Sequence, residues 1–139
     1  MVLDTSVLVA AIRSPTGASM ALVERALLGD LEIVVSTALV LEYESVLTRN
    51  EHLRVAQLSI EEVDEVLDSI CRTARQVAIR WHWRPQLRDP DDEMVLEAAL
   101  NGSADAIVTF NRAHFLSAAR RFSLQVFLPS EALERIGVP

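Results

Sequence analysis

The stretch that decides the fold is residues 1–12, MVLDTSVLVAAI. A charged residue, Asp4, stands inside an otherwise apolar run, and two hydroxyl residues, Thr5 and Ser6, follow it directly. This pattern predicts a short buried strand that ends at Asp4 and a helix that begins after it, because aspartate caps a helix N-terminus well. In parallel α/β sheets, ligands bind at the carboxyl ends of the strands. Asp4 is therefore either an N-cap or a member of a functional site at that edge.

Three further short runs rich in β-branched residues also predict buried strands, and helical patterns separate them. The predicted strands are residues 2–4, 31–35, 106–109 and 124–128. Besides the helix after Asp4, the predicted helices are residues 19–28, 36–47, 59–74, 91–100 and 130–136. Strands that alternate with helices predict an α/β fold with a central parallel sheet covered on both faces. With 139 residues, half of them hydrophobic, we expect a single domain over residues 1–139.

The helix at residues 59–74 has one apolar stripe and one acidic face. The stripe consists of Ile60, Val63, Leu67 and Ile70. We expect the acidic face to be solvated. This helix lies in a helical insertion between the second strand and the helix at 91–100, and we expect the insertion to protrude as an arm.

The net charge of −7 argues against a general nucleic-acid coat protein, although it does not exclude a local nucleic-acid site. The single cysteine, Cys71, excludes an intramolecular disulfide and fits a reducing cytoplasm. The opening run has no positive residue before its apolar part, and no stretch is long and apolar enough to span a bilayer. We therefore expect a cytoplasmic protein without a secretory signal or a membrane partner.

A second acid, Glu42, lies in the predicted helix TALVLEYESVL, where Leu39, Tyr43 and Val46 surround it at helical spacing. A glutamate on an apolar helix face is costly unless it is paired or bound to a metal. Glu42 is therefore a candidate functional residue, and a buried salt bridge to an arginine is the alternative.

A third group of acids lies in RDPDDEMVLEAAL, where Asp89 before Pro90 is a favourable helix start. Acids in the first turn complement the helix dipole, so most of this group needs no functional explanation. Asp92 shares a face with Leu96 and Ala99, whereas Asp91 shares one with Val95 and Ala98. Spacing alone does not choose between Asp91 and Asp92.

The fourth strand ends in IVTFN, which brings Thr109 and Asn111 to the same edge. We expect Phe110 between them to pack into the protein. Asp105 begins this strand, so it belongs to the opposite edge of the sheet. The three histidines share no metal-ligand spacing, and we expect each to be structural or exposed. They are His52, His82 and His114.

Carboxylates that gather at one edge repel each other unless a cation lies among them. Oxygen ligands without histidine or thiolate favour magnesium or manganese. Such a site can generate a hydroxide and stabilise the oxygens of a phosphodiester displacement. The sequence therefore predicts metal-assisted phosphodiester hydrolysis.

The chain resembles the PIN-domain family, and within it the VapC-like toxin nucleases of type II toxin-antitoxin pairs. The resemblance is carried in order by VLDTSVLVAAI, LVLEYESVL, DPDDEMVLEAAL, ADAIVTFNRAHF and FLPSEAL. It implies a three-layer α/β/α domain that cleaves RNA with Mg²⁺ or Mn²⁺. Carried over by position, the family's acids fall on Asp4, Glu42 and Asp92. The resemblance also implies an antitoxin partner that covers the active edge and a homodimer.

The chain departs from the family at Asn111, where many members carry an aspartate; asparagine would weaken metal binding or limit it to one ion. Ser6, where asparagine is common, keeps a polar group that can orient Asp4, and Thr109 supports the same pocket. Three arginines after the fourth strand are candidates for phosphate contact, with ordinary surface arginines as the alternative. They are Arg112, Arg120 and Arg121.

Other classes of protein place an aspartate at the end of such a strand. Haloacid-dehalogenase-like phosphatases need a second aspartate two residues later, where this chain has Ser6, and they need a lysine. Response-regulator receiver domains also need a lysine, and all thirteen basic residues here are arginine. The remaining alternative is a PIN-like module that binds RNA or a protein without cutting.

Overall fold

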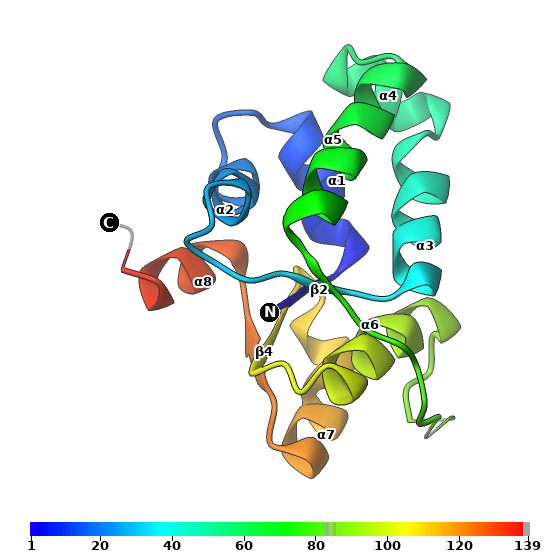
Figure 1. The fold of residues 1–139 in the computed structure, drawn as a ribbon, viewed down its shortest axis with the longest axis vertical. Helices are drawn as coiled ribbons and strands as arrows, with labels where there is room; N and C mark the ends of the chain where they lie inside the picture. The colour runs from blue at the N-terminus through cyan, green and yellow to red at the C-terminus, as the bar shows by residue number, and fades with distance from the viewer. Residues whose placement is uncertain (83, 85, 138–139) are drawn as a thin grey trace.

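Parallel strands form the centre of the computed structural model, which describes residues 1–82, 84 and 86–137. One sheet consists of β1 (Val2–Leu3), β4 (Ala106–Val108) and β5 (Gln125–Phe127), in the order β1-β4-β5 (Figure 1). A second parallel pair consists of β2 (Val34–Val35) and β3 (Arg75–Gln76). The amide of Val34 donates to the carbonyl of Met1 at 2.9 Å, so β2 runs beside β1 and extends the strand order to β3-β2-β1-β4-β5.

Helices cover the strands on both sides. Their bounds in chain order are α1 (Thr5–Arg13), α2 (Ala18–Leu27), α3 (Thr37–Leu47), α4 (Asn50–Ala56), α5 (Ile60–Thr73), α6 (Pro90–Asn101), α7 (Arg112–Phe122) and α8 (Pro129–Arg135). In Figure 1, α6 and α7 lie below the strands, whereas α1 to α5 lie above them. The predicted three-layer α/β/α fold with a parallel sheet is confirmed.

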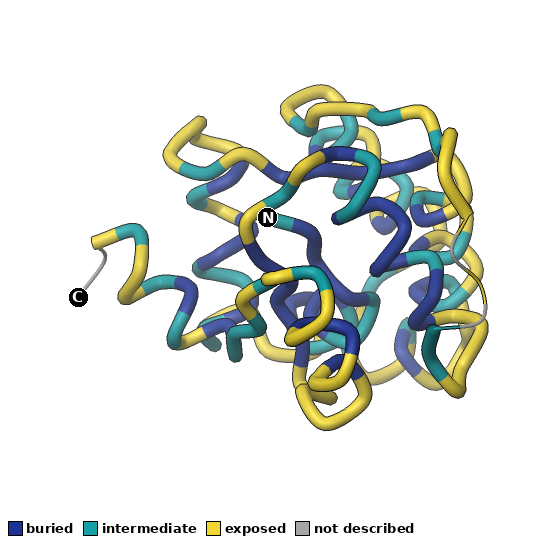
Figure 2. Tube along the Cα trace, turned by 90° about the horizontal axis from the view of Figure 1, so that it is seen from below, coloured by how far each residue is buried: buried dark blue, intermediate teal, exposed yellow. Residues whose placement is uncertain are grey.

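One cluster of buried side chains lies between these layers and joins residues from the strands and from most of the helices. Figure 2 shows the buried segments in the interior and the exposed segments at the periphery. Gly102 ends α6 at a tight contact, because a Cβ atom there would lie 2.6 Å from Cγ1 of Val34. Only glycine permits this approach of α6 to β2.

The predicted elements agree with the observed ones except at their ends, but three elements were not predicted. The strands are shorter than predicted, and the ends of the predicted helices differ from the observed ones by one residue at most. The elements without a prediction are α4, α7 and β3. Strand β3 is exposed on both of its residues, so it has no hydrophobic pattern to reveal it.

The helical insertion corresponds to α3, α4 and α5, which rise away from the strands in Figure 1. It is not an independent arm, because α5 buries Val63, Leu67 and Ile70 and contacts α2 and α3. Ile60 was predicted in the same apolar stripe, but it is 50% exposed at the first position of the helix. Ser59 begins α5 with a capping box, in which its hydroxyl accepts from the amide of Glu62.

Within the described part of the chain, no single helix is long and apolar enough to cross a membrane. Helices α1 and α2 pass that test of length and composition only when they are taken together across a bend of 104°.

Candidate functional site

Asp4 occupies the N-cap position of α1 without capping it. Its backbone is extended, and its amide donates to the carbonyl of Val108 at 2.9 Å, so the hydrogen bonding between β1 and β4 continues to Asp4. The carboxylate makes no hydrogen bond to the helix amides. Instead, its Oδ2 accepts from the hydroxyls of Ser6 at 2.8 Å and Thr109 at 2.6 Å. Asp4 is only 6% exposed, so two hydroxyls fix a buried carboxylate at the edge of the sheet.

Thr109 connects the turn after β4 to this carboxylate by hydrogen bonds. Its side chain is fully buried, and its amide donates to the carbonyl of Phe127 at 2.9 Å. Its hydroxyl oxygen also accepts from the amide of Asn111 at 2.9 Å. The Ser6 hydroxyl similarly accepts from the amide of Phe110 at 3.3 Å. The two supporting hydroxyls therefore fix the turn as well as the acid.

The third supporting residue, Thr5, begins α1 and is partly exposed. Its side chain makes no hydrogen bond to Asp4 in the part of the chain that the structure describes. The structure thus joins two of the three predicted supporting residues to the acid.

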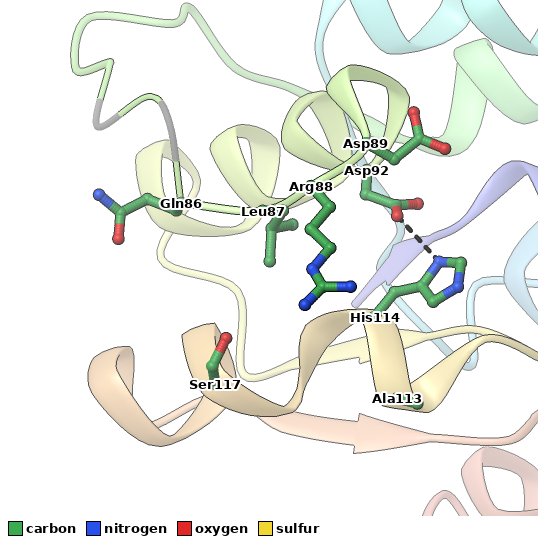
Figure 3. A pocket seen from close by; sticks show the side chains of 8 residues that line it. All are labelled: Gln86, Leu87, Arg88, Asp89, Asp92, Ala113, His114 and Ser117. Carbon is green, nitrogen blue, oxygen red and sulfur yellow. Dashed lines mark hydrogen bonds and ion pairs between the residues drawn. The ribbon is translucent and has the colours of Figure 1, made fainter.

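Asp92 lies in the first turn of α6 and is 7% exposed, whereas Asp91 is exposed. Oδ2 of Asp92 lies 3.0 Å from Nδ1 of His114, as the dashed line in Figure 3 marks. Burial raises the pKa of Asp92, and the charges of Asp4 and Asp89 raise it further, although His114 opposes them. Asp4 and Asp92 therefore act on each other at the same edge, from segments far apart in the sequence.

Glu42 lies on α3 and is half-buried. Burial raises the pKa of Glu42, and the charge of Asp91 adds to this, whereas Arg49 opposes it. Among the described residues Glu42 forms no ion pair, so the salt bridge considered as its alternative is not present there. Its neighbour Tyr43 donates to the carbonyl of Leu3 at 2.5 Å, which fixes α3 against the end of β1. Glu42 thus lies on the Asp91 side of the site.

The remaining predicted residues lie on or beside α7. Asn111 is exposed at the N-cap position and makes no capping bond through its side chain. Arg112 is the first residue of α7, and its guanidinium forms an ion pair with the carboxylate of Glu131 at 3.0 Å. Arg120 and Arg121 lie in the last turn, roughly 12 Å further along the helix at 1.5 Å per residue. Arg121 donates to Oε1 of Gln86 at 2.8 Å, so the segment before α6 holds its side chain, and among the described residues no acid of the site does.

Phe110 differs from its sequence prediction, and His114 makes a contact that the sequence did not indicate. His114 is exposed, as predicted, but it also pairs with Asp92, which was not predicted. Phe110 was expected to pack, but it is 50% exposed at the edge of the site. The position of His114 follows once a helix begins at Arg112, because His114 then falls in its first turn. That helix was not predicted, so nothing in the pattern indicated that His114 pairs with an acid.

A pocket of about 700 Å³ opens beside Asp92, between the chain before α6 and one face of α7 (Figure 3). Its lining residues are Gln86, Leu87, Arg88, Asp89, Asp92, Ala113, His114 and Ser117. The pocket therefore contains two acids at the start of α6, Asp89 and Asp92, together with His114 of α7 and Arg88 of the segment before α6.

The donor atoms of this edge fit one hard cation better than a closed metal cage. Among the described residues, no group of three or more histidine, cysteine, aspartate or glutamate side chains is placed to hold a metal ion. Two buried carboxylates, Asp4 and Asp92, nevertheless face the cost of their mutual repulsion. Magnesium commonly binds to one or two carboxylates and keeps several waters, which is the arrangement these two acids allow.

Comparisons with known proteins give one match. The family model described as PIN domain matches residues 1–113, a range that includes the three predicted acids and Asn111 and excludes Arg120 and Arg121. No curated protein and no solved structure matches the chain.

Proposed function

Because the chain belongs to the PIN domain family, whose members are generally metal-dependent nucleases, we propose that it hydrolyses RNA phosphodiester bonds with Mg²⁺ or Mn²⁺. The observation that supports this best is the pair of buried carboxylates at the carboxyl edge of the strands. Asp4 and Asp92 come from separate segments, and burial together with the charge of Asp4 raises the pKa of Asp92 in spite of its contact with His114. A divalent cation bound between them would offset the repulsion between the two carboxylates.

In this proposal Asp4 and Asp92 hold the metal ion. When bound, the ion lowers the pKa of a water and stabilises charge on the phosphodiester. Ser6 and Thr109 keep Asp4 in one orientation, because both donate to the same carboxylate oxygen. In the same proposal, Glu42 and Asn111 serve as further oxygen donors to the ion or its waters. The pocket beside Asp92 admits the RNA.

A PIN-like module that binds RNA or protein without cutting remains the second candidate. The observations that favour it are the neutral side chain of Asn111, where many family members carry an aspartate, and the lack of a three-acid group among the described residues. A site with fewer acids binds a divalent cation less tightly. The two candidates differ in one measurable property, which is metal-dependent cleavage.

The test is incubation of the pure protein with single-stranded and structured RNA in Mn²⁺, in Mg²⁺ and in EDTA. We expect cleavage with metal alone, and we expect Asp4→Asn to lower its rate by about 100-fold or more. Loss of a group that merely orients a ligand already costs roughly 10–100-fold. Asp105→Asn is the matched control, since Asp105 precedes β4 at the opposite edge of the sheet. RNA that stays intact but bound would establish the non-cleaving module.

We further propose that the nuclease is the toxin of a toxin-antitoxin pair, acts in the cytoplasm and forms a homodimer. The support is the resemblance to VapC-like toxins together with the acidic edge, which an arginine or lysine of an antitoxin can neutralise. Purified with its antitoxin, the protein should be inactive, and removal of that basic residue should restore cleavage. Sedimentation of the free chain tests the dimer. A neighbouring gene for a small protein distinguishes a toxin from a housekeeping nuclease.

A further inference from the structure

One polar stripe on α6 holds the chain that precedes the helix. Its members, Glu93, Glu97 and Asn101, are four residues apart and so lie on one face. Oε1 of Glu93 accepts from the amides of Gln86 at 2.6 Å and Leu87 at 2.8 Å. Glu93 and Glu97 are 3% and 4% exposed, which makes them buried acids outside the site described above.

The other two members of the stripe hold the earlier part of the same segment. Glu97 accepts from Nε of Arg84 at 3.1 Å and lies 2.6 Å from Nδ1 of His82. Oδ1 of Asn101 accepts from the amides of Arg80 and Trp81, each at 2.9 Å. Groups of Arg80, Trp81, His82, Arg84, Gln86 and Leu87 are thus bound to α6 at three successive turns. We call the described residues of this segment, 80–82, 84 and 86–88, the strap, and its last three residues line one wall of the pocket.

The strap ends in an arginine without a partner. The Arg88 side chain is exposed and makes no hydrogen bond or ion pair with any residue that the structure describes. In Figure 3 its guanidinium extends into the pocket, on the side of Asp92 that faces α7. By contrast, Arg84 and Arg112 are already paired with Glu97 and Glu131. Arg88 is therefore a cation directed at the space beside the buried Asp92.

We propose that Arg88 binds a backbone phosphate of the RNA substrate next to the phosphodiester that is cut, and that the pocket receives the nucleotide between them. This inference rests on the proposed function. A guanidinium forms two parallel hydrogen bonds to phosphate oxygens, which fixes position as well as charge. A volume of about 700 Å³ lies within the range of sites for small ligands, so a nucleotide fits.

The charges of the pocket support this assignment. Asp89 and Asp92 line the pocket and would repel a polyanion, so a cation of the protein is needed there to offset that repulsion. Arg88 is the arginine among the lining residues, and the strap bonds at Gln86 and Leu87 limit its freedom. A fixed backbone lowers the entropy that the side chain loses when it binds a phosphate.

The test is the affinity for a short fluorescent single-stranded RNA, measured by anisotropy in EDTA, where the proposed nuclease does not cut. We expect Arg88→Gln to weaken binding about tenfold, the loss of one charge-assisted contact. The slope of log affinity against log salt should fall by about 0.7. Arg88→Lys should keep the slope and lose part of the affinity. Arg54→Gln is the matched control, since Arg54 is exposed on α4 and makes the same change of charge.

The second readout is cleavage in Mn²⁺, where Arg88→Gln should raise KM about tenfold and change kcat little. If the wild-type protein cuts RNA, but Arg88→Gln and Arg54→Gln share its affinity, salt slope and KM, the inference is wrong and the nuclease function stands. If the wild-type protein neither binds nor cuts RNA, the proposed function fails and this inference fails with it.

Discussion

At the scale of single residues, the orientation of Asp4 depends on a small network of hydroxyls and amides. Thr109 has the central place in it, because its hydroxyl donates to Asp4 and accepts from the amide of Asn111. A buried hydroxyl that both donates and accepts holds its partners more strictly than either bond alone. Its loss should therefore affect the acid and the turn together.

We predict that Thr109→Val, which keeps the shape of the side chain, lowers metal affinity and RNA cleavage roughly 10–100-fold. The free energy of unfolding should also fall, by about 1–3 kcal/mol, because a buried carboxylate loses a donor and the Asn111 amide loses an acceptor. Calorimetric titration with Mn²⁺ and urea unfolding measure the two effects.

Thr109→Ser is the matched control, because it keeps the hydroxyl and removes only a methyl group. It should restore most of the metal affinity while it still loses some stability to the missing packing. Equal metal affinity in the Val and Ser variants would show that the Thr109 hydroxyl does not orient Asp4.

At the scale of elements, the stripe on α6 makes the strap depend on pH. Burial alone would raise the pKa of Glu97, but the hydrogen bonds and charges of Arg84 and His82 outweigh it and leave the pKa below its ordinary value. A lowered pKa means that the folded protein binds the proton of Glu97 less tightly than the unfolded chain does. This stabilisation is therefore complete above the ordinary glutamate pKa of about 4.5 and is lost as the pH falls through the lower value in the folded protein.

We predict that Glu97→Gln loosens the strap at neutral pH to the degree that acid loosens it in the wild-type protein. Loss of the charged partner should cost about 1–3 kcal/mol, since Arg84 is partly exposed and stays hydrated. Hydrogen exchange of the Gln86 and Leu87 amides should become faster, while exchange in α5 should not change.

Glu65→Gln is the control, because Glu65 lies on the exposed face of α5. The quantity to compare is the protection factor of the strap amides. Equal protection factors in the wild-type protein and in Glu97→Gln at neutral pH, with no decrease in the wild-type protein at acid pH, would contradict this role of Glu97.

Hydrophobic pattern was sufficient to predict four of the strands and most of the helices, because their residues repeat at the period of the element. The predicted burial of the last strand was wrong, since the residues of β5 are exposed or only partly buried. The pattern was not sufficient for β3, because both of its residues are exposed. They form a strand through their backbone pairing with β2. Helix α7 was missed because its buried face is mostly alanine around Phe115, which gives a weak apolar signal. The strap also escaped prediction, since bonds from α6 side chains, not a repeat, define it.

At the scale of the whole molecule, the site consists of segments that only the fold brings together. The sequence predicted that Asp4, Thr109 and Asn111 reach one edge, because each follows a strand or begins a helix there. The spacing of residues did not decide whether Asp91 or Asp92 belongs to the site. In the structure Asp92 is buried and Asp91 is exposed. The partner of Asp92, His114, lies on the unpredicted helix. The residue pattern of a single segment does not predict a contact such as Asp92 with His114, because that contact depends on how α6 and α7 pack against each other.

The repulsion between the buried acids predicts how metal changes the stability of the folded chain. Burial and the charges of Asp4 and Asp89 raise the pKa of Asp92, so the ionised pair weakens the metal-free protein above that pKa. A cation that binds only the folded state stabilises it by about 2.7 kcal/mol at 100 times its Kd. We therefore predict that Mn²⁺ at that level raises the Tm by roughly 5–10 °C, since about 1 kcal/mol shifts a chain of this size by a few degrees.

Asp92→Asn should separate the two contributions. It removes the repulsion, so the metal-free variant should melt at or above the Tm of the wild-type protein, and it removes a ligand, so most of the metal-induced shift should vanish. Asp105→Asn should keep the full shift, because Asp105 lies at the other edge of the sheet. Differential scanning calorimetry with and without Mn²⁺ measures all three proteins. A full shift in Asp92→Asn would mean that the ion binds elsewhere, and no shift in the wild-type protein would mean that the acidic edge binds no metal.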